Sequence, residues 1–266
     1  MNMLLIKVGG GKDVNWDNIA ADPFFKKGRA IVVHGANYFM EETLRRLGIS
    51  SKVIHSPSGQ ISRYTDREVM EVMTMVYSGL VNKRAVMTFQ KNGINAIGVS
   101  GADGRIWQGV RKQTIYAVEE EKTKMVSDSL TGKVVSVNHR LLTNLMESKY
   151  LPVLTVPAIS DKGELINVDN DRAVAVMVRD LKIREVVMLF EAPGLLAQST
   201  NEDSLIKRIK KGDIDTFLGQ TSGRMKKKLL GIKEALNYGA GRIYLSDGRI
   251  KNPVTRALQA CGTVIE

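Results

Sequence analysis

The chain has 266 residues, of which 43% are hydrophobic and 25% are charged, a composition that excludes disordered, collagen-like and miniature disulfide-stapled proteins. Lysine and arginine outnumber aspartate and glutamate by 39 to 28, and the resulting formal charge of +11 indicates a protein that attracts anions. Cys261 is the single cysteine, so an intramolecular disulfide is excluded and we expect a reducing, cytoplasmic location.

Six short runs of apolar, often β-branched residues alternate with helical patterns along the chain. Runs that are apolar on both faces are typical of central strands in a mostly parallel sheet. We therefore expect an α/β fold, with a mostly parallel central sheet sandwiched by helices, in a single domain over 1–266. The predicted strands are 3–8, 30–34, 94–100, 151–157, 184–190 and 241–246.

The longest helical pattern covers 66–92, between an aspartate suited to cap its start and a glycine suited to end it. Val69, Met73, Val76 and Leu80 form one apolar stripe along it, which we expect in the core or at a subunit interface. No apolar run approaches ~18 residues, so we expect no membrane span. The other predicted helices are 38–47, 172–181 and 223–237, and two hairpins, 56–66 and 101–124, are expected to project beyond the sheet.

Glycine-rich turns follow the first two strands. The first strand runs into KVGGG at 7–11, where uncovered N–H groups can approach phosphate oxygens and Lys7 adds a positive charge. The second ends in HGAN at 34–37, and two such turns at the ends of neighbouring parallel strands converge on one crevice. Neither is a Walker A loop or a dinucleotide fingerprint. Tight turns without a ligand stay open as the alternative.

Further polar residues follow later strands. The segment NVDND, 167–171, has four polar side chains in five residues, which exceeds what a helix cap requires and favours a functional site. The lysines at 226–228 are, taken alone, typical of a solvated helix face. The three histidines show no metal-ligand spacing, so we expect no metal held by protein side chains.

Together these segments resemble the amino acid kinase family over the whole chain. The resemblance implies the amino acid kinase, carbamate kinase-like fold. Within the family the chain is most similar to the acetylglutamate kinase branch, and GQISRYTD at 59–66 resembles the subgroup whose substrate is carried by LysW, a small acidic protein. The motifs that carry the resemblance are KVGGG at 7–11, HG at 34–35, SGADG at 100–104, NVDND at 167–171, EAPGLL at 191–196 and GRMKKK at 223–228.

The resemblance implies a phosphotransferase with a carboxyl group as acceptor. Such an enzyme uses ATP and Mg²⁺ to phosphorylate the side chain of LysW-bound aminoadipate or glutamate, forming an acyl phosphate in lysine or arginine biosynthesis. It also implies a homodimer. The alternatives are a kinase of free N-acetylglutamate and a regulatory pseudokinase that binds nucleotide or amino acid without catalysis. Nucleic-acid binding is not expected, because only 6% of the residues are aromatic and no recognition motif is present.

The resemblance also implies a role for individual residues. Lys7 and Lys228 match the two lysines that contact the transferred phosphoryl group, and Asp171 matches the aspartate that holds both. About 1–160 would bind the acceptor and about 161–266 the nucleotide. Residues that match substrate-binding positions are Gly35, Ala36, Arg63 and Asn167. Residues that match nucleotide- or phosphate-binding positions are Gly9, Gly10, Glu191, Gly194, Gly223 and Met225.

The chain departs from the family pattern at three places. Ala36 and Asn37 replace the second and third glycines of HGGG, Glu191 replaces an aspartate, and Arg224 replaces the second of two glycines. None of these changes removes a charge that the chemistry needs. A carboxylate is already ionised at neutral pH, so its phosphorylation requires alignment and cations rather than a His or Cys nucleophile.

Basic residues near the substrate-side hairpin would speed the encounter with an acidic carrier. Scattered solvated charge is the alternative interpretation. The candidates are Arg45, Arg46, Lys52, Arg67, Lys83 and Arg84.

Overall fold

An eight-stranded sheet forms the centre of the protein in the computed structural model, which describes residues 3–55, 61–119 and 122–266. Its neighbours are parallel except for one antiparallel pair, β15 and β16, at one side. All six predicted runs lie in it, which confirms the mostly parallel sheet. In spatial order the strands are β14 (Arg208–Ile209), β16 (Thr263–Ile265), β15 (Arg242–Asp247), β13 (Glu185–Phe190), β1 (Leu4–Val8), β2 (Ala30–His34), β10 (Leu151–Thr155) and β5 (Ala96–Ser100).

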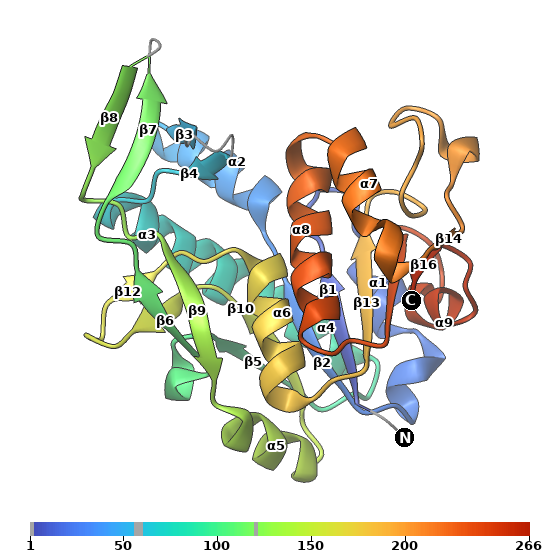
Figure 1. The fold of residues 1–266 in the computed structure, drawn as a ribbon. Helices are drawn as coiled ribbons and strands as arrows, with labels where there is room; N and C mark the ends of the chain where they lie inside the picture. Colours follow the sequence, from blue (N-terminus) through green and yellow to red (C-terminus); the bar gives the residue numbers. More distant parts are fainter. Residues whose placement is uncertain (1–2, 56–60, 120–121) are drawn as a thin grey trace.

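Helices cover both faces of this sheet (Figure 1). Alternate residues of β1 face opposite sides, so Leu5 packs in one hydrophobic cluster while Leu4 and Ile6 pack in the other. Burial of each such side chain stabilises the fold by roughly 1.5–3 kcal/mol. The predicted arrangement, with the sheet between two layers of helices, is confirmed. One face packs against α2 (Asn37–Leu47), α3 (Arg67–Met73), α6 (Asn170–Leu181) and α8 (Gly223–Asn237), the other against α1 (Trp16–Ala20), α4 (Asn82–Lys91) and α9 (Pro253–Leu258).

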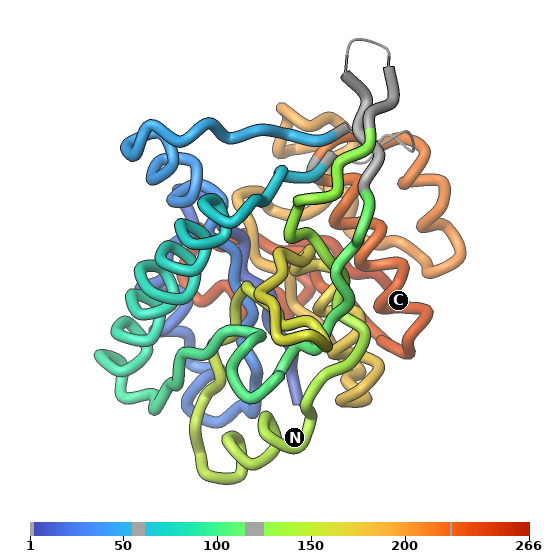
Figure 2. Tube along the Cα trace, turned by 90° about the vertical axis from the view of Figure 1, so that its left-hand side faces the viewer, coloured from blue at the N-terminus to red at the C-terminus, as the bar shows by residue number. Residues whose placement is uncertain are grey.

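The helix predicted over 66–92 is one continuous rod along the side of the molecule (Figure 2) with a π-helical middle. Asp66 caps its start, because its carboxylate accepts a hydrogen bond from the Val69 N–H at 2.9 Å. Between α3 and α4 lies the π-helix η2 (Thr74–Val81), whose wider turns shift the buried stripe. Leu80 is therefore exposed while Val81 is buried, which excludes the core as the place of Leu80 and leaves the expected subunit interface untested.

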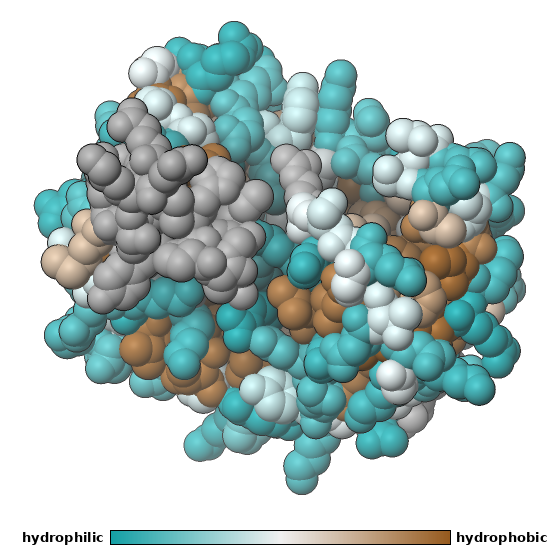
Figure 3. All heavy atoms as spheres, turned by 45° about the horizontal axis from the view of Figure 1, so that its top comes forward, coloured by the Kyte–Doolittle hydropathy of each residue, from teal (hydrophilic) through white to brown (hydrophobic). Residues whose placement is uncertain are grey.

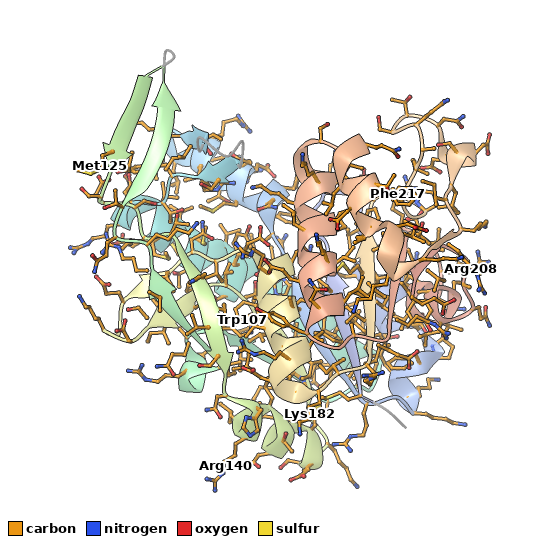
Figure 4. All side chains as sticks on the ribbon, in the orientation of Figure 1. Trp107, Met125, Arg140, Lys182, Arg208 and Phe217 are labelled. Atoms are coloured by element: carbon orange, nitrogen blue, oxygen red, sulfur yellow. The ribbon has the colours of Figure 1, made fainter. Side chains whose placement is uncertain are left out.

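A second sheet and two hairpins lie beside the main sheet. The region 101–124 does not form one projecting hairpin as predicted, because its first part, β6 (Trp107–Arg111), pairs with β9 (Gly132–Val137) and β11 (Ala158–Ser160). Only β7 (Ile115–Glu119) and β8 (Lys122–Val126) project (Figure 1), and Figure 4 places Met125 on this hairpin and Trp107 in the interior. The hairpin predicted over 56–66 pairs β3 (Val53–His55) with β4 (Ile61–Arg63). Residues 56–60 and 120–121 lie outside the described part.

The remaining elements are short. Among the residues described, no helix combines the length and the apolar character needed to cross a bilayer.

Two predicted helices begin earlier than expected, α2 at Asn37 and α6 at Asn170, which brings Asp171 into the first turn of α6. The other segments are β12 (Leu165–Ile166), α5 (His139–Glu147), α7 (Ile214–Gln220), η1 (Pro23–Lys26), η3 (Asp103–Arg105), η4 (Glu202–Ser204) and η5 (Lys211–Asp213).

Candidate active site

A buried ion pair joins the centre of the sheet to the start of α6. Lys7 lies near the carboxyl end of β1, a central strand, and is only 7% exposed. Its Nζ is 2.8 Å from Oδ1 of Asp171, in the first turn of α6. The positive end of the α6 dipole adds to the stabilisation of this carboxylate. The structure thus brings together two of the three residues predicted to be catalytic.

The third of these residues, Lys228, enters from α8, which lies side by side with α6 (Figure 1). Gly231, nearly one turn after Lys228, makes the close packing possible, since a Cβ there would lie only 2.8 Å from Cβ of Asp171. Lys228 is 9% exposed, and its Nζ lies 4.7 Å from the ring centre of Phe190. Lys228 is therefore not part of a solvated lysine face.

The three charged groups perturb one another. Burial raises the pKa of Asp171, but the charges of Lys228 and Lys7 outweigh burial and lower it to about 2. Burial likewise lowers the pKa of Lys7, yet the charge and hydrogen bond of Asp171 prevail and hold it above its usual value. For Lys228 burial prevails and, with the charge of Lys7, lowers the pKa to about 8 despite Asp171. Asp171 thus pairs directly with Lys7, and Lys228 lies close enough for its charge to act on both.

The two glycine turns meet beside this cluster, as expected from the adjacency of β1 and β2. A Cβ on Gly10 would lie 2.4 Å from the backbone nitrogen of Ala36, so the turns touch backbone to backbone. Gly35 lies equally close, because its Cβ would be 3.1 Å from the nitrogen of Gly10. Gly9 continues the main sheet and donates its N–H to Leu189 O at 2.8 Å. The resulting surface of bare amides suits an anion.

Glu191, which directly follows the neighbouring strand β13, contacts the first turn. A Cβ on Gly11 would lie 1.8 Å from its Oε2, and its Oε1 accepts a hydrogen bond from the Asp13 N–H at 2.7 Å. The extra methylene relative to aspartate lets this carboxylate reach the backbone after the glycines. Glu191 therefore supports the turn that faces the lysines.

The residues predicted to bind nucleotide are less tightly grouped. Gly223 begins α8 with φ +57, a conformation that glycine adopts without strain, and Met225 is partly buried against the core. Gly194 lies elsewhere, against β16, since a Cβ there would be 2.5 Å from Oγ1 of Thr263. The close approach of Gly194 to β16 accounts for a glycine at that position, and no described contact joins Gly194 to the lysine pair.

Two of the residues predicted to bind the acceptor, Asn167 and Arg63, are linked through one threonine. Asn167 Nδ2 donates to Oγ1 of Thr65 at 2.9 Å, and that hydroxyl donates to the carbonyl of Arg63 at 3.2 Å. The Arg63 guanidinium pairs with Glu41 at 2.6 Å and donates to Oγ of Ser51 at 2.6 Å. Thr65 and Glu41 were missed by the sequence analysis, because long-range pairing leaves no local signal.

The buried ring of His34 contacts the backbone of the second turn. It is fully buried, its Nδ1 lies 3.2 Å from the carbonyl of Gly35, and Asn82 Nδ2 lies 3.1 Å from its Nε2. Burial lowers the pKa of His34 to about 4, so the ring is neutral and accepts from Asn82. Thr155 and Asn170 each donate to the His34 carbonyl at 3.0 Å. The sequence motif included His34 but gave no sign of these partners.

The arrangement suits the binding and transfer of a phosphoryl group. Two buried ammonium groups lie near the two glycine turns, and α6 begins beside them. Among the described residues, no group of three or more His, Cys, Asp or Glu side chains is placed to hold a metal ion. The donor set therefore fits the phosphates of a nucleotide better than a protein-held metal.

Comparisons with known proteins agree with this chemistry. A model of the amino acid kinase family matches residues 3–246. The chain is 41% identical over 268 residues to a LysW-aminoadipate kinase of Thermus thermophilus, covering 99% of this chain and 100% of that protein. It is also 41% identical to a LysW-aminoadipate kinase of Deinococcus radiodurans, covering 100% of this chain and 92% of that protein.

Solved structures show the same fold at low sequence identity. N-acetylglutamate synthase from Neisseria gonorrhoeae matches with a TM-score of 0.77 at 17% identity, over 99% of this chain and 59% of that one. Carbamate kinase from Giardia lamblia bound to AMP-PNP matches with a TM-score of 0.64 at 14% identity, over 99% and 98%. The expected carbamate kinase-like fold is confirmed.

Proposed function

This chain belongs to the amino acid kinase family, and we propose that it transfers the γ-phosphoryl group of ATP to the side-chain carboxylate of an acidic amino acid carried by a small acidic protein of the LysW kind. The observation that carries the proposal is the meeting of Lys7 and Lys228 at Asp171, beside two amide-lined turns. The names of the two relatives favour aminoadipate as the carried amino acid, with glutamate as the second candidate. The product is an acyl phosphate, an intermediate suited to lysine or arginine biosynthesis.

The obstacle in this reaction is the repulsion between two anions, the acceptor carboxylate and the nucleotide phosphates. Lys7 comes from the first strand and Lys228 from α8, so they approach the transferring group from different parts of the chain. Their charges stabilise the negative charge that spreads over the phosphoryl oxygens in the transition state. Asp171 holds both ammonium groups in place and so reduces the reorganisation needed during the reaction. No general base is required, because the acceptor is already ionised.

The two halves of the chain divide the substrates between them. About 1–160 binds the acceptor, through Gly35, Ala36 and Arg63, and Asn167 joins them through Thr65. About 161–266 binds the nucleotide. In Figure 3 hydrophobic side chains reach the surface at the right, where Figure 1 places the C-terminal part, and such a surface suits an adenine ring. Helix α7, which carries Phe217, stands on the opposite side of α8 from the β7–β8 hairpin (Figure 4).

Magnesium accompanies the nucleotide in this proposal. The ion neutralises phosphate charge when it is bound and retains most of its waters, so few protein ligands are needed. Lys7, Lys228 and the backbone amides of 10–11 then supply the remaining positive potential from the protein.

The carrier approaches a basic surface. Arg45 and Arg46 are exposed near the end of α2, and Lys52 and Arg67 are exposed on either side of the β3–β4 pair. This charge is complementary to an acidic carrier and lies on the same side as Arg63, whose partner Glu41 is also on α2. The association rate would therefore fall as salt rises.

A homodimer is also part of the proposal, through the outer face of the long helix. Met75, Leu80 and Met87 are exposed there, at 57%, 38% and 64%, and their contiguity along the rod indicates a protein interface. Lys83 and Arg84 lie in the first turn of α4, and Arg84 lies 5.7 Å from the ring centre of Phe39 on α2, next to the basic surface there. The exposed thiol of Cys261 is consistent with the expected cytoplasmic location.

The test is a hydroxamate assay for acyl phosphate with ATP and magnesium and three acceptors in parallel: carrier-bound aminoadipate, carrier-bound glutamate and free N-acetylglutamate. We expect turnover with a carrier-bound acceptor and little with the free one. Turnover only with free N-acetylglutamate would establish the alternative kinase, and nucleotide binding without turnover on any acceptor would establish the pseudokinase. The intact cluster of Lys7, Asp171 and Lys228 favours catalysis over the last alternative.

A further inference from the structure

Asn37 stands where the two glycine turns meet, at a position that is glycine in the HGGG pattern. It is the first residue of α2, and its side chain is exposed. A Cβ on Gly10 would lie 2.6 Å from the Asn37 backbone nitrogen, so Asn37 borders the first glycine turn. Ala36 before it provides no side-chain cap for α2. Asn37 is thus the first side chain of this helix that can hydrogen-bond at the junction of the turns.

A buried tyrosine holds the Asn37 carboxamide. The hydroxyl of Tyr77 donates to Asn37 Oδ1 over 2.6 Å, and Tyr77 is only 5% exposed. Tyr77 lies in the π-helix η2, whose altered register turns it and Val81 inward. Burial raises the pKa of Tyr77 to about 12, against the charge of Arg63 and the amide of Ala36. The phenol therefore keeps its proton and acts as a donor at neutral pH.

This contact fixes the direction of the carboxamide. Because Oδ1 of Asn37 accepts from Tyr77, the Nδ2 group occupies the other edge of the planar amide and presents two N–H donors. No residue in the described part of the chain accepts a hydrogen bond from this Nδ2. Asn37 directly follows Ala36, a residue predicted to bind the acceptor, and the charges of Arg63 and Glu41 reach the Tyr77 phenol.

We infer that Asn37 is an acceptor-binding residue whose Nδ2 amide donates a hydrogen bond to the carboxylate that receives the phosphoryl group, and that Tyr77 positions it. The inference rests on the function proposed above. A neutral carboxamide orients the carboxylate without the strong charge neutralisation that a third lysine would impose on the nucleophile. A glycine at this position would leave only backbone N–H groups, so Asn37 adds a directed contact to the turn.

Two substitutions at Asn37 test the contact, with carrier-bound aminoadipate, ATP and magnesium in the hydroxamate assay. Asn37→Asp preserves the shape and the oxygen that accepts from Tyr77 but replaces the donor with an anion, and Asn37→Gly removes the side chain. We expect kcat/KM for the acceptor to fall by about tenfold to a hundredfold in Asn37→Gly and by more in Asn37→Asp. The KM for ATP should change by less than about threefold, since the contact is with the acceptor.

Tyr77→Phe tests the positioning role through its dependence on Asn37. We expect kcat/KM for the acceptor to fall about tenfold in the wild-type background and to stay unchanged in the Asn37→Gly background. A role confined to packing would produce the same loss in both backgrounds. Tyr38→Phe is the matched control, because Tyr38 is a neighbouring exposed tyrosine, and it should leave both constants unchanged.

Unchanged acceptor kinetics in both Asn37 variants would overturn the inference, and an equal loss from Tyr77→Phe in both backgrounds would overturn the positioning role. These outcomes leave the proposed function intact, because they require an active wild-type enzyme. If the wild-type protein phosphorylates none of the three acceptors, the proposed function fails and the inference fails with it.

Discussion

Replacing Lys228 with methionine should abolish turnover and at the same time stabilise the fold. Burial and the charge of Lys7 lower the pKa of Lys228 from 10.5 to about 8. At roughly 1.4 kcal/mol per pH unit, this difference is a cost of about 3 kcal/mol for keeping the ammonium group charged in the folded protein. Lys228 is 9% exposed, so solvent relieves little of this cost. Methionine fills a similar volume without charge. It leaves the ion pair of Lys7 and Asp171, whose net charge is zero, in place.

The pH dependence distinguishes this cost from ordinary packing. The unfolded chain holds the Lys228 proton up to about pH 10.5 and the folded protein releases it near pH 8, so the unfolded state binds more protons between these values. The free energy of unfolding of the wild type therefore rises with pH over this window, relative to the variant. Below pH 8 the full cost is present, and Lys228→Met should be more stable by about 2–3 kcal/mol.

Urea denaturation of the wild type and Lys228→Met at pH 7 and at pH 10 measures both quantities, with the hydroxamate assay for turnover. We expect the stability difference at pH 7 to shrink at pH 10. Lys226→Met is the matched control, because Lys226 is exposed on the same helix and its replacement should change stability by less than ~0.5 kcal/mol. A Lys228→Met protein at least ~1 kcal/mol less stable than the wild type at pH 7 would refute the electrostatic reasoning.

Three further predictions follow from the same geometry. In the enzyme without substrate, Lys228 loses its proton near pH 8, so kcat/KM for ATP should fall above that pH. A pH-rate profile that stays flat to pH 9.5 would contradict this. Arg63→Ala should raise the KM for the acceptor about tenfold or more with little change for ATP, as measured by initial rates, and an unchanged acceptor KM would remove Arg63 from the site. Gly231→Ala should destabilise the fold by about 1–3 kcal/mol and lower turnover, because its Cβ would separate α8 from Asp171; wild-type stability and turnover would disprove the close approach.

The main sheet was predictable because its central strands are apolar on both faces. All six predicted runs overlap β1, β2, β5, β10, β13 and β15. The strands β14 and β16 were not predicted, because β14 has two residues and β16 three, too few to show a periodic pattern. The π-helix was also missed, since no local propensity distinguishes its register from an α-helix, and its wider turns leave Leu80 outside the core.

Some residues of the candidate site could be predicted from local sequence patterns, and others depend on partners that are distant in the sequence. Local pattern identified the glycine turns and the polar segment before α6, and the adjacency of β1 and β2 correctly predicted that the turns meet. Lys228 looked like one of several surface lysines, and its burial depends on the packing of Gly231 against Asp171, far apart in sequence. Thr65 and Tyr77 gave no local signal, because their roles arise from partners on other elements.

The most direct test of the account is the turnover of Lys7→Ala and Lys228→Ala with carrier-bound aminoadipate at saturating ATP and magnesium. If two ammonium groups flank one phosphoryl group, each substitution removes a preorganised cation worth about 3–4 kcal/mol of barrier, and turnover falls at least about a hundredfold in each. Nucleotide affinity, measured by calorimetry, should weaken only modestly. Turnover close to that of the wild type in either variant would contradict the mechanism.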